Sequence, residues 1–134
     1  IEMEYSVAVA DVPAILSRID QAVQDAGIDL LFPIEVRTAA ADDIPLSTAF
    51  GRDSGYIAVH RGKGVAYRRY FELVEAIMDE FDGRPHWGKM HFQTAATLAP
   101  RYPEWDQFQQ LRAKYDPAGV FTNDYTNRVL GPVG

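Results

Sequence analysis

The stretch Glu2-Met3-Glu4-Tyr5-Ser6-Val7-Ala8-Val9-Ala10 decides the type of fold, because polar and apolar side chains alternate along it. One face carries the apolar side chains of Met3, Tyr5, Val7 and Val9. The other face carries Glu2, Glu4 and Ser6. A period of two is typical of a half-buried strand, so we expect a strand over residues 2–10 whose apolar face packs on a core.

An amphipathic helix follows this strand. Asp11 supplies an N-cap oxygen, Pro13 suits the first helical turn, and Gly27 ends the pattern. Between them, apolar residues recur at helical spacing at Ile15, Leu16, Ile19 and Val23. The sequence therefore predicts a helix between residues 11 and 27 that packs by this stripe.

The alternation of strand and helix patterns continues downstream. Strands are predicted over residues 34–38 and 56–60, separated by a loop over 39–54 that is rich in turn residues. A second helix is predicted over residues 66–81, with Gly83 as its end signal. Its buried stripe is Tyr70, Val74, Ile77, Met78 and Phe81.

The C-terminal third is less regular. Residues 84–92 are expected to be extended, since Pro85 disfavours a helical residue before it and Gly88 permits a close approach. A third helix is predicted from Pro103 to a stop at 116–119. The side chains it should direct inward are Trp105, Phe108, Leu111 and Tyr115. Residues 120–130 show no clear period.

The order strand, helix, strand, then again strand, helix, strand, indicates an α+β fold. We expect a ferredoxin-like antiparallel or mixed sheet with helices on one face and an open face opposite. The residues that would share this open face are Glu35, Arg37, His60, Trp87 and Lys89. An open sheet face would also favour self-association of the chain.

Composition limits the possible functions. The 134 residues, 47% of them hydrophobic, suffice for one domain with a core, so we treat residues 1–134 as a single domain. A net charge of -6 argues against a nucleic-acid or anionic-membrane surface, which needs clustered positive charge. No apolar run is long enough to span a bilayer. The absence of cysteine excludes thiolate chemistry and is compatible with a cytoplasmic protein.

Two segments carry the candidate chemistry. Glu35 and Arg37 stand at positions i and i+2 of one strand, so both face the same side and can act together on a third group. A weak, solvent-exposed ion pair is the structural alternative. Lys89 follows Trp87 at the same spacing within Arg84-Pro85-His86-Trp87-Gly88-Lys89. Here the alternative is a solvated lysine.

Histidine offers a third kind of candidate group. His60 ends the strand 56–60, where site residues tend to lie, although a hydrogen-bonded structural histidine is the alternative. His60, His86 and His91 lack the tight spacing of metal ligands, so we expect no metal site. The basic connection 61–64 lacks the spacing of a phosphate loop and is given no nucleotide-binding role.

Four segments occur in an order that resembles a known family. They are Ile34-Glu35-Val36-Arg37-Thr38, the strand ending in His60, Arg84-Pro85-His86-Trp87-Gly88-Lys89 and Asp116-Pro117-Ala118-Gly119-Val120-Phe121-Thr122-Asn123-Asp124-Tyr125. The chain resembles the sugar-lactone oxidoreductases, the flavoproteins that include L-gulonolactone, D-arabinonolactone and alditol oxidases, within the vanillyl-alcohol oxidase superfamily. The resemblance implies the C-terminal substrate (cap) domain of such an enzyme, with FAD bound mainly by an N-terminal domain.

The resemblance also implies roles for individual residues. Lys89 would approach the flavin where negative charge develops on reduction. Arg37 would hold the substrate hydroxyl that loses its proton as hydride passes to the flavin, and Glu35 would bind a neighbouring hydroxyl. The remaining matches are His60 as a substrate contact and His86 and Asn123 as flavin neighbours.

The implied function is FAD-dependent oxidation of an aldonolactone, such as L-gulono-1,4-lactone or D-arabinono-1,4-lactone. Oxidation of an alditol is the alternative within the family, because both substrates offer adjacent hydroxyls. A non-catalytic sugar-binding or interaction domain is the alternative from another class. The chain enters a strand pattern directly after Ile1, which suggests a missing upstream part. The N-terminal FAD-binding domain of the same protein would then be its partner, and the chain alone would be inactive.

Overall fold

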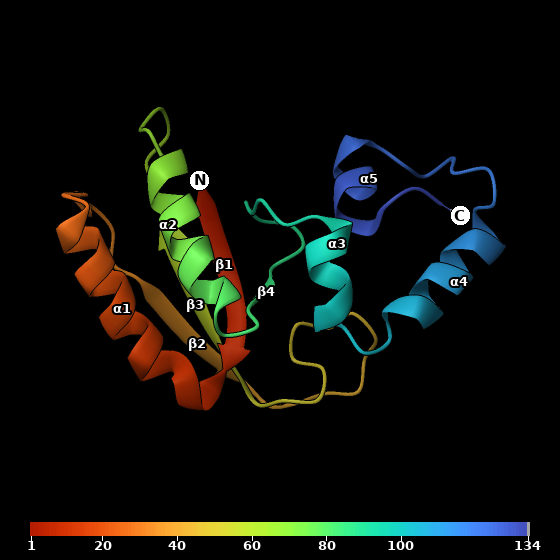
Figure 1. Ribbon diagram of the computed structural model, residues 1–134, viewed down its shortest axis with the longest axis horizontal. Coiled ribbons are helices and arrows are strands. Elements are labelled where there is room, and N and C mark those ends of the chain that lie inside the picture. The colour runs from red at the N-terminus through yellow and green to blue at the C-terminus, as the bar shows by residue number, and fades with distance from the viewer. Residues whose placement is uncertain (134) are drawn as a thin grey trace.

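The computed structural model describes residues 1–133 (Figure 1). Its first part holds β1 (Glu2–Ala8), α1 (Val12–Asp25), β2 (Glu35–Ala39), β3 (Ser54–His60), α2 (Arg68–Asp79) and β4 (Arg84–Pro85). Its second part holds α3 (Ala95–Leu98), α4 (Trp105–Tyr115) and α5 (Asp124–Leu130). Short 3-10 helices, η1 (Val9–Asp11) and η2 (Ala99–Arg101), precede α1 and follow α3. No helix among residues 1–133 has the length and apolar character needed to cross a bilayer.

The four strands form one antiparallel sheet in the order β2-β3-β1-β4. In its register, Ala58 of β3 lies between Glu4 of β1 and Glu35 of β2. α1 and α2 lie together against one face of the sheet (Figure 1). This arrangement confirms the predicted α+β, ferredoxin-like class.

The main core lies between the sheet and these two helices. Tyr5 of β1 and Phe71 of α2 have no solvent exposure. The buried members of this core are Met3, Tyr5, Val7, Val12, Ile15, Ile19, Val23, Ile57, Val59, Tyr70, Phe71, Val74, Ile77 and Met78. Burying each large apolar side chain contributes about 1.5–3 kcal/mol. The predicted stripes of both helices are confirmed, with Leu16 and Phe81 partly buried at the edge.

Gly83 turns the chain from α2 into β4. Its N–H donates to the carbonyl of Met78 at 2.9 Å, and a Cβ atom at this position would lie only 2.8 Å from the same oxygen. It would also lie 3.0 Å from the ring of Tyr5. A residue without a side chain is therefore needed to bring β4 alongside β1.

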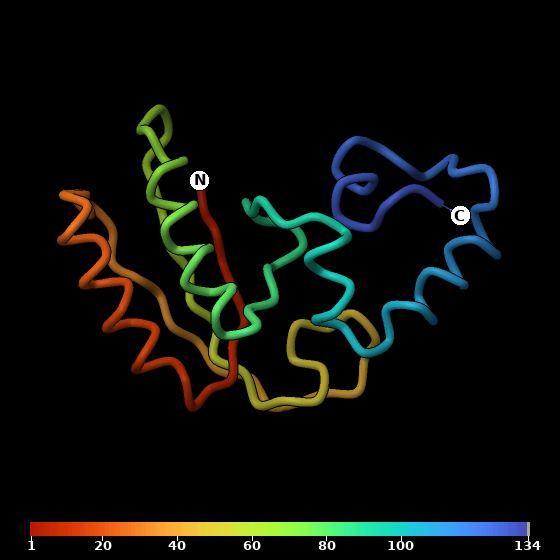
Figure 2. Tube along the Cα trace, in the orientation of Figure 1, coloured from red at the N-terminus to blue at the C-terminus, as the bar shows by residue number. Residues whose placement is uncertain are grey.

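The C-terminal helices lie beyond β4, away from α1 and α2 (Figure 2). A second, smaller core lies among them. Its buried members are Leu98, Tyr102, Trp105 and Val129. The loop over 40–53 runs from the sheet to these helices (Figure 2), where Leu46 and Trp87 pack against the second core. The indole of Trp87 donates to the carbonyl of Leu46 at 3.0 Å. This loop therefore links the sheet to the second core.

Two of the predicted strands, the first and the last, are shorter in the structure. The strand expected to reach Ala10 ends at Ala8, because η1 redirects the chain into α1. The extended segment expected over 84–92 is a strand only at Arg84–Pro85. The chain then leaves the sheet and forms a turn, in which Lys89 N–H donates to the carbonyl of His86 at 3.1 Å.

One expectation for the C-terminal helices was wrong, and one helix was not predicted. Leu111 and Tyr115 of α4 are 46% and 75% exposed, because they line an open groove rather than the second core. Residues 124–130, for which the sequence analysis made no structural prediction because no period is apparent, form α5. A helix this short contains too few residues to establish a periodic pattern.

Candidate functional site

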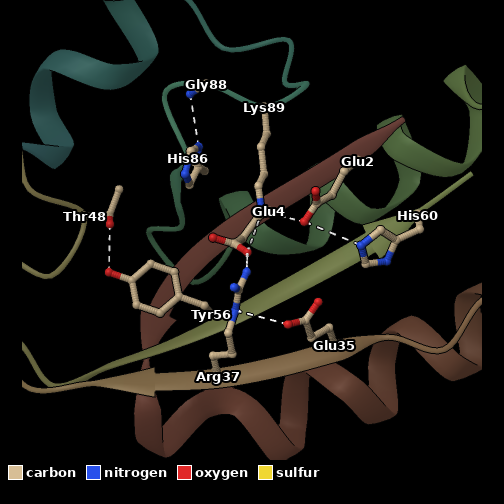
Figure 3. A network of polar contacts seen from close by, with 10 residues as sticks. All are labelled: Glu2, Glu4, Glu35, Arg37, Thr48, Tyr56, His60, His86, Gly88 and Lys89. Carbon is tan, nitrogen blue, oxygen red and sulfur yellow. Dashed lines mark hydrogen bonds and ion pairs between the residues drawn. The ribbon is translucent and has the colours of Figure 1, made fainter.

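The sheet face opposite α1 and α2 carries a group of charged side chains (Figure 3). This charged cluster consists of Glu2, Glu4, Glu35, Arg37, His60 and Lys89. Five of the six come from β1, β2 and β3, whose alternate residues share one face. The sixth, Lys89, reaches in from the turn after β4. The structure therefore brings together four residues predicted from the sequence, namely Glu35, Arg37, His60 and Lys89.

Glu4 lies at the centre of the charged cluster. Its side chain is only 4% exposed. Its Oε2 atom accepts hydrogen bonds from Arg37 Nη2 and, at 2.9 Å, from Lys89 Nζ. A buried carboxylate is tolerated as an anion only when cations or donors surround it. Glu4 thus joins two cations that come from separate segments of the chain.

The polar face of β1 is less open than predicted. The two cations cover Glu4, and Ser6 has no solvent exposure. The hydroxyl of Ser6 donates to the carbonyl of Thr48 at 2.8 Å, because the loop over 40–53 folds across this end of the sheet. The expectation of an open sheet face was therefore wrong at these two positions.

Lys89 is also paired with Glu2. Its Nζ lies 2.5 Å from Glu2 Oε1, and His60 Nε2 lies 3.5 Å from the same oxygen. Burial alone would lower the pKa of Lys89, but hydrogen bonds to Glu2 and Glu4 outweigh it and raise this pKa. Burial opposes ionisation of Glu2, yet the hydrogen bond from Lys89 lowers its pKa. Both groups are therefore charged at neutral pH.

Arg37 and Glu35 lie side by side at the solvent side of the charged cluster. Arg37 Nε is 3.4 Å from Glu35 Oε1, and their side chains are 52% and 51% exposed. The charge of Glu4 and its hydrogen bond raise the pKa of Arg37. The remaining guanidinium N–H groups and the Glu35 carboxylate form a donor and an acceptor next to each other. Such a pair can bind two neighbouring hydroxyl groups.

β1 holds the turn that carries Lys89 at both of its ends. His86 N–H donates to the carbonyl of Glu4 at 2.9 Å, and Met90 N–H donates to the carbonyl of Glu2 at 3.0 Å. The same two glutamates bind the ammonium group of Lys89 with their carboxylates. Backbone and side-chain contacts to β1 therefore fix Lys89 together.

His86 and Trp87 do not join the charged cluster. The exposed ring of His86 accepts a hydrogen bond from Gly88 N–H at 3.0 Å, and its place next to a flavin stays a prediction. The expectation that Trp87 shares the sheet face with Lys89 was wrong, because this segment is a turn rather than a strand. Trp87 packs instead against the second core.

The motif Asp116–Asn123 forms the loop that starts α5. The carboxylate of Asp116 accepts from two backbone N–H groups, at 2.7 and 2.9 Å, four and five residues ahead. Gly119 has φ of 65°, a conformation that favours glycine. The side chain of Asn123 accepts from Thr126 N–H at 2.9 Å and so caps α5. Contact between Asn123 and a flavin stays a prediction.

An open cavity of about 480 Å³ adjoins the charged cluster beside Lys89. Apart from Glu2 and Lys89, its walls are Ile1, Trp87, Gly88, Met90 and Tyr125. Apolar walls with a few charged groups are typical of a small-molecule site. The cavity therefore adjoins the same ion-pair network that contains Glu35 and Arg37.

Three members of the charged cluster have the geometry of metal ligands. One ligand atom from each of Glu2, Glu35 and His60 lies within 4.8 Å of the others. Lys89, however, is already bound to Glu2 at 2.5 Å and would repel a cation there. We therefore interpret these three residues as part of an ion-pair network.

The sequence analysis did not identify Glu2 and Glu4 as members of the site. The alternation of polar and apolar residues could have indicated them, because it places both carboxylates on the polar face of the first strand. Their partner Lys89 lies 87 and 85 residues away in the chain. Only the pairing of β1 with β4 brings the three together.

Comparison with known proteins gives a consistent result. The family described as D-arabinono-1,4-lactone oxidase matches residues 1–129. An L-gulono-1,4-lactone dehydrogenase of Mycobacterium tuberculosis is 53% identical over 98% of this chain and 31% of its own length. An alditol oxidase of a Streptomyces species is 34% identical over 97% of this chain and 31% of its own length. The L-gulonolactone oxidase of Mus musculus is 43% identical over 74% of this chain and 23% of its own length.

These relatives are much longer than the chain. The chain spans about a third of the two bacterial proteins, at 31% of each. The resemblance to sugar-lactone oxidoreductases that the four sequence segments indicated is confirmed.

Proposed function

Because the chain belongs to the D-arabinono-1,4-lactone oxidase family, we propose that the protein containing it oxidises an aldonolactone with FAD. In this proposal, Glu35, Arg37 and Lys89 are the chain's contribution to catalysis. The supporting observation is that Glu4 binds both Arg37 and Lys89, so that a hydroxyl-binding pair and a partly buried cation are held next to each other over one sheet face.

The residues beside the cavity fit a flavin. A flavin, when bound, supplies a ring system that accepts hydride and carries negative charge once reduced. The cavity has apolar and aromatic walls at Met90, Trp87 and Tyr125, which suit a planar ring. Lys89 supplies a cation at the same wall, and its raised pKa keeps it protonated. A preorganised cation stabilises negative charge without reorganisation during the reaction.

The pair Glu35 and Arg37 suits the substrate. Its half-exposed carboxylate and guanidinium can bind two hydroxyls at once, as the adjacent hydroxyls of a sugar lactone require. We assign Arg37 to the hydroxyl that is oxidised, because a fixed cation stabilises the oxygen as it loses its proton. His60, 3.5 Å from Glu2, would be a further substrate contact.

An alditol is the second candidate substrate. One of the relatives is an alditol oxidase, 34% identical over nearly the whole chain. An open-chain polyol offers the same adjacent hydroxyls to Glu35 and Arg37. Reduction of the enzyme by xylitol, but not by L-gulono-1,4-lactone, would favour this candidate.

The test is anaerobic reduction of the protein expressed from its complete gene. We expect a flavin spectrum that L-gulono-1,4-lactone bleaches, and reduction that is roughly 100-fold or more slower in Lys89→Ala and in Arg37→Ala. The matched control is Lys63→Ala, which removes an exposed lysine from the loop before α2. Unchanged rates in both site variants would refute the assignment of these residues. A colourless protein that binds the lactone would favour a non-catalytic sugar-binding domain.

A further inference from the structure

We infer that Tyr125 is a positioning residue for Lys89, acting through the backbone of the turn that carries this lysine. The inference rests on the role proposed above for Lys89. The hydroxyl of Tyr125 donates to the carbonyl of Trp87, and the ring of His91 binds the same hydroxyl at 3.0 Å. Trp87 lies two residues before Lys89 and His91 lies two residues after it. One tyrosine therefore binds the turn on both sides of the lysine.

The hydrogen bonds at Tyr125 also determine where the protons lie. The O–H of Tyr125 donates to the carbonyl of Trp87, so the oxygen of Tyr125 must accept a hydrogen bond from His91. The Nε2 atom of His91 therefore carries the proton. His91 is only 3% exposed. Burial, together with the charge of Arg128, lowers the pKa of His91 to about 4. The ring is thus a neutral, fixed donor throughout the neutral pH range.

The ring of Tyr125 is itself held in place by α5. The guanidinium of Arg128 lies 5.3 Å from the centre of this ring and donates to the carbonyl of Gln93. The rings of His91 and Tyr125 form a T-shaped pair with a centroid distance of 5.8 Å and an interplanar angle of 75°. The cap made by Asn123 starts the same helix. The motif Asp116–Asn123 thereby acts on Lys89 indirectly, through the placement of Tyr125.

Tyr125 complements the contacts from β1. Glu2 and Glu4 hold the turn from the sheet side, through His86 and Met90. Tyr125 holds the opposite side, at Trp87, and is also a wall of the cavity beside Lys89. Without its hydroxyl the turn keeps its attachment to the sheet, and the carbonyl of Trp87 loses this donor. We therefore expect a loosened turn in a protein that remains folded.

The experiment uses the whole flavin-containing protein and compares Tyr125→Phe with Tyr67→Phe, which removes a tyrosine hydroxyl at the start of α2. We expect amide hydrogen exchange over residues 86–91 to be about tenfold faster in Tyr125→Phe only. Flavin reduction by L-gulono-1,4-lactone should be about tenfold slower, because small displacements of a catalytic group are costly. The lactone concentration for half-maximal reduction should stay within about twofold, since Glu35 and Arg37 are untouched.

Substitutions of His91 provide a second, independent test. His91→Gln keeps an N–H donor for Tyr125 and should retain most of the reduction rate, whereas His91→Leu removes one of the two hydrogen bonds of Tyr125 and should show a smaller loss than Tyr125→Phe. Normal exchange and normal reduction in Tyr125→Phe would overturn the inference. Slow reduction in Lys89→Ala with normal reduction in Tyr125→Phe would overturn only the positioning role. Normal reduction in Lys89→Ala would instead overturn the proposed function.

Discussion

The two faces of the sheet are built from alternate residues of the same strands, yet they are stabilised in different ways. On β1, Tyr5 points into the core under α1 and α2, while its neighbour Glu4 points into the charged cluster. Burial of apolar area stabilises the first face. Paired charges on the second face offset desolvation and contribute little net stability. Substitutions of adjacent residues in the sequence should therefore affect stability to different degrees, with larger effects on the covered face than on the charged face.

The largest expected effect comes from opening the covered face. Phe71→Ala removes a side chain with no solvent exposure and should lower the free energy of unfolding by roughly 3–5 kcal/mol, through lost burial and a cavity. Phe121→Ala is the matched control, because Phe121 is 83% exposed and its loss should change stability by about 0.5 kcal/mol or less. Urea unfolding of the chain measures both. Equal effects of the two substitutions would contradict the assignment of the core.

A smaller effect is expected on the charged face. Glu4→Gln leaves Lys89 without one of its two carboxylates and should destabilise the chain by about 2 kcal/mol, the scale of a hydrogen bond between charged groups. Glu72→Gln makes the same chemical change at an exposed ion pair with Arg68 and should have a much smaller effect. Urea midpoints of the two variants provide the comparison. A larger loss in Glu72→Gln would show that Glu4 is not the centre of the network.

The smallest effect is a difference in pH dependence between the faces. Burial raises the pKa of Glu75, which lies on the covered face and accepts hydrogen bonds from Tyr5 O–H and from Phe92 N–H at 2.8 Å. A raised carboxyl pKa stabilises the fold below the unfolded pKa, and this contribution is lost as pH rises through the folded pKa. The lowered pKa of Glu2 has the opposite effect on stability. Its stabilising contribution is present above the unfolded pKa and is lost as pH falls through the folded pKa.

Two substitutions test these opposite pH dependences of stability. As pH increases from about 4 to 7, the free energy of unfolding of Glu75→Gln should rise relative to that of the unsubstituted protein. Over the same increase, the free energy of unfolding of Glu2→Gln should fall relative to that of the unsubstituted protein. Thermal unfolding across this range measures both differences. The same slope in both variants would contradict the opposite environments of the two carboxylates.

The covered face could be predicted from the sequence more completely than the charged one. Periods of two and 3.6 identified the strand that contains Tyr5 and the helix that contains Phe71, because apolar burial is a local pattern. The same reasoning placed Glu35, Arg37 and His60 on one face. It did not identify Glu4 as a counter-ion, since the partners of Glu4 are set by strand pairing and not by local pattern.

The turn after β4 shows a second limit of sequence reasoning. An extended segment through Lys89 was expected from Pro85 and Gly88, whereas the strand ends at Pro85 and the chain forms a turn that is bonded to β1 at His86 and Met90. Contacts from Tyr125 and Glu2 hold the turn, and both lie far from it in the sequence. Local signals can suggest that Lys89 matters, but they do not reveal what holds it. Its role in catalysis stays a proposal.

The central position of β1 also determines when the fold can be completed during synthesis. β1 is made before the other strands of the sheet, and its neighbours β3 and β4 are made much later. Pairing between distant segments is slow, typically on the order of milliseconds to seconds. A nascent chain that ends before β4 therefore exposes one edge of its central strand. Since the turn with Lys89 follows directly, we expect the last strand and the charged cluster to assemble in the same late step.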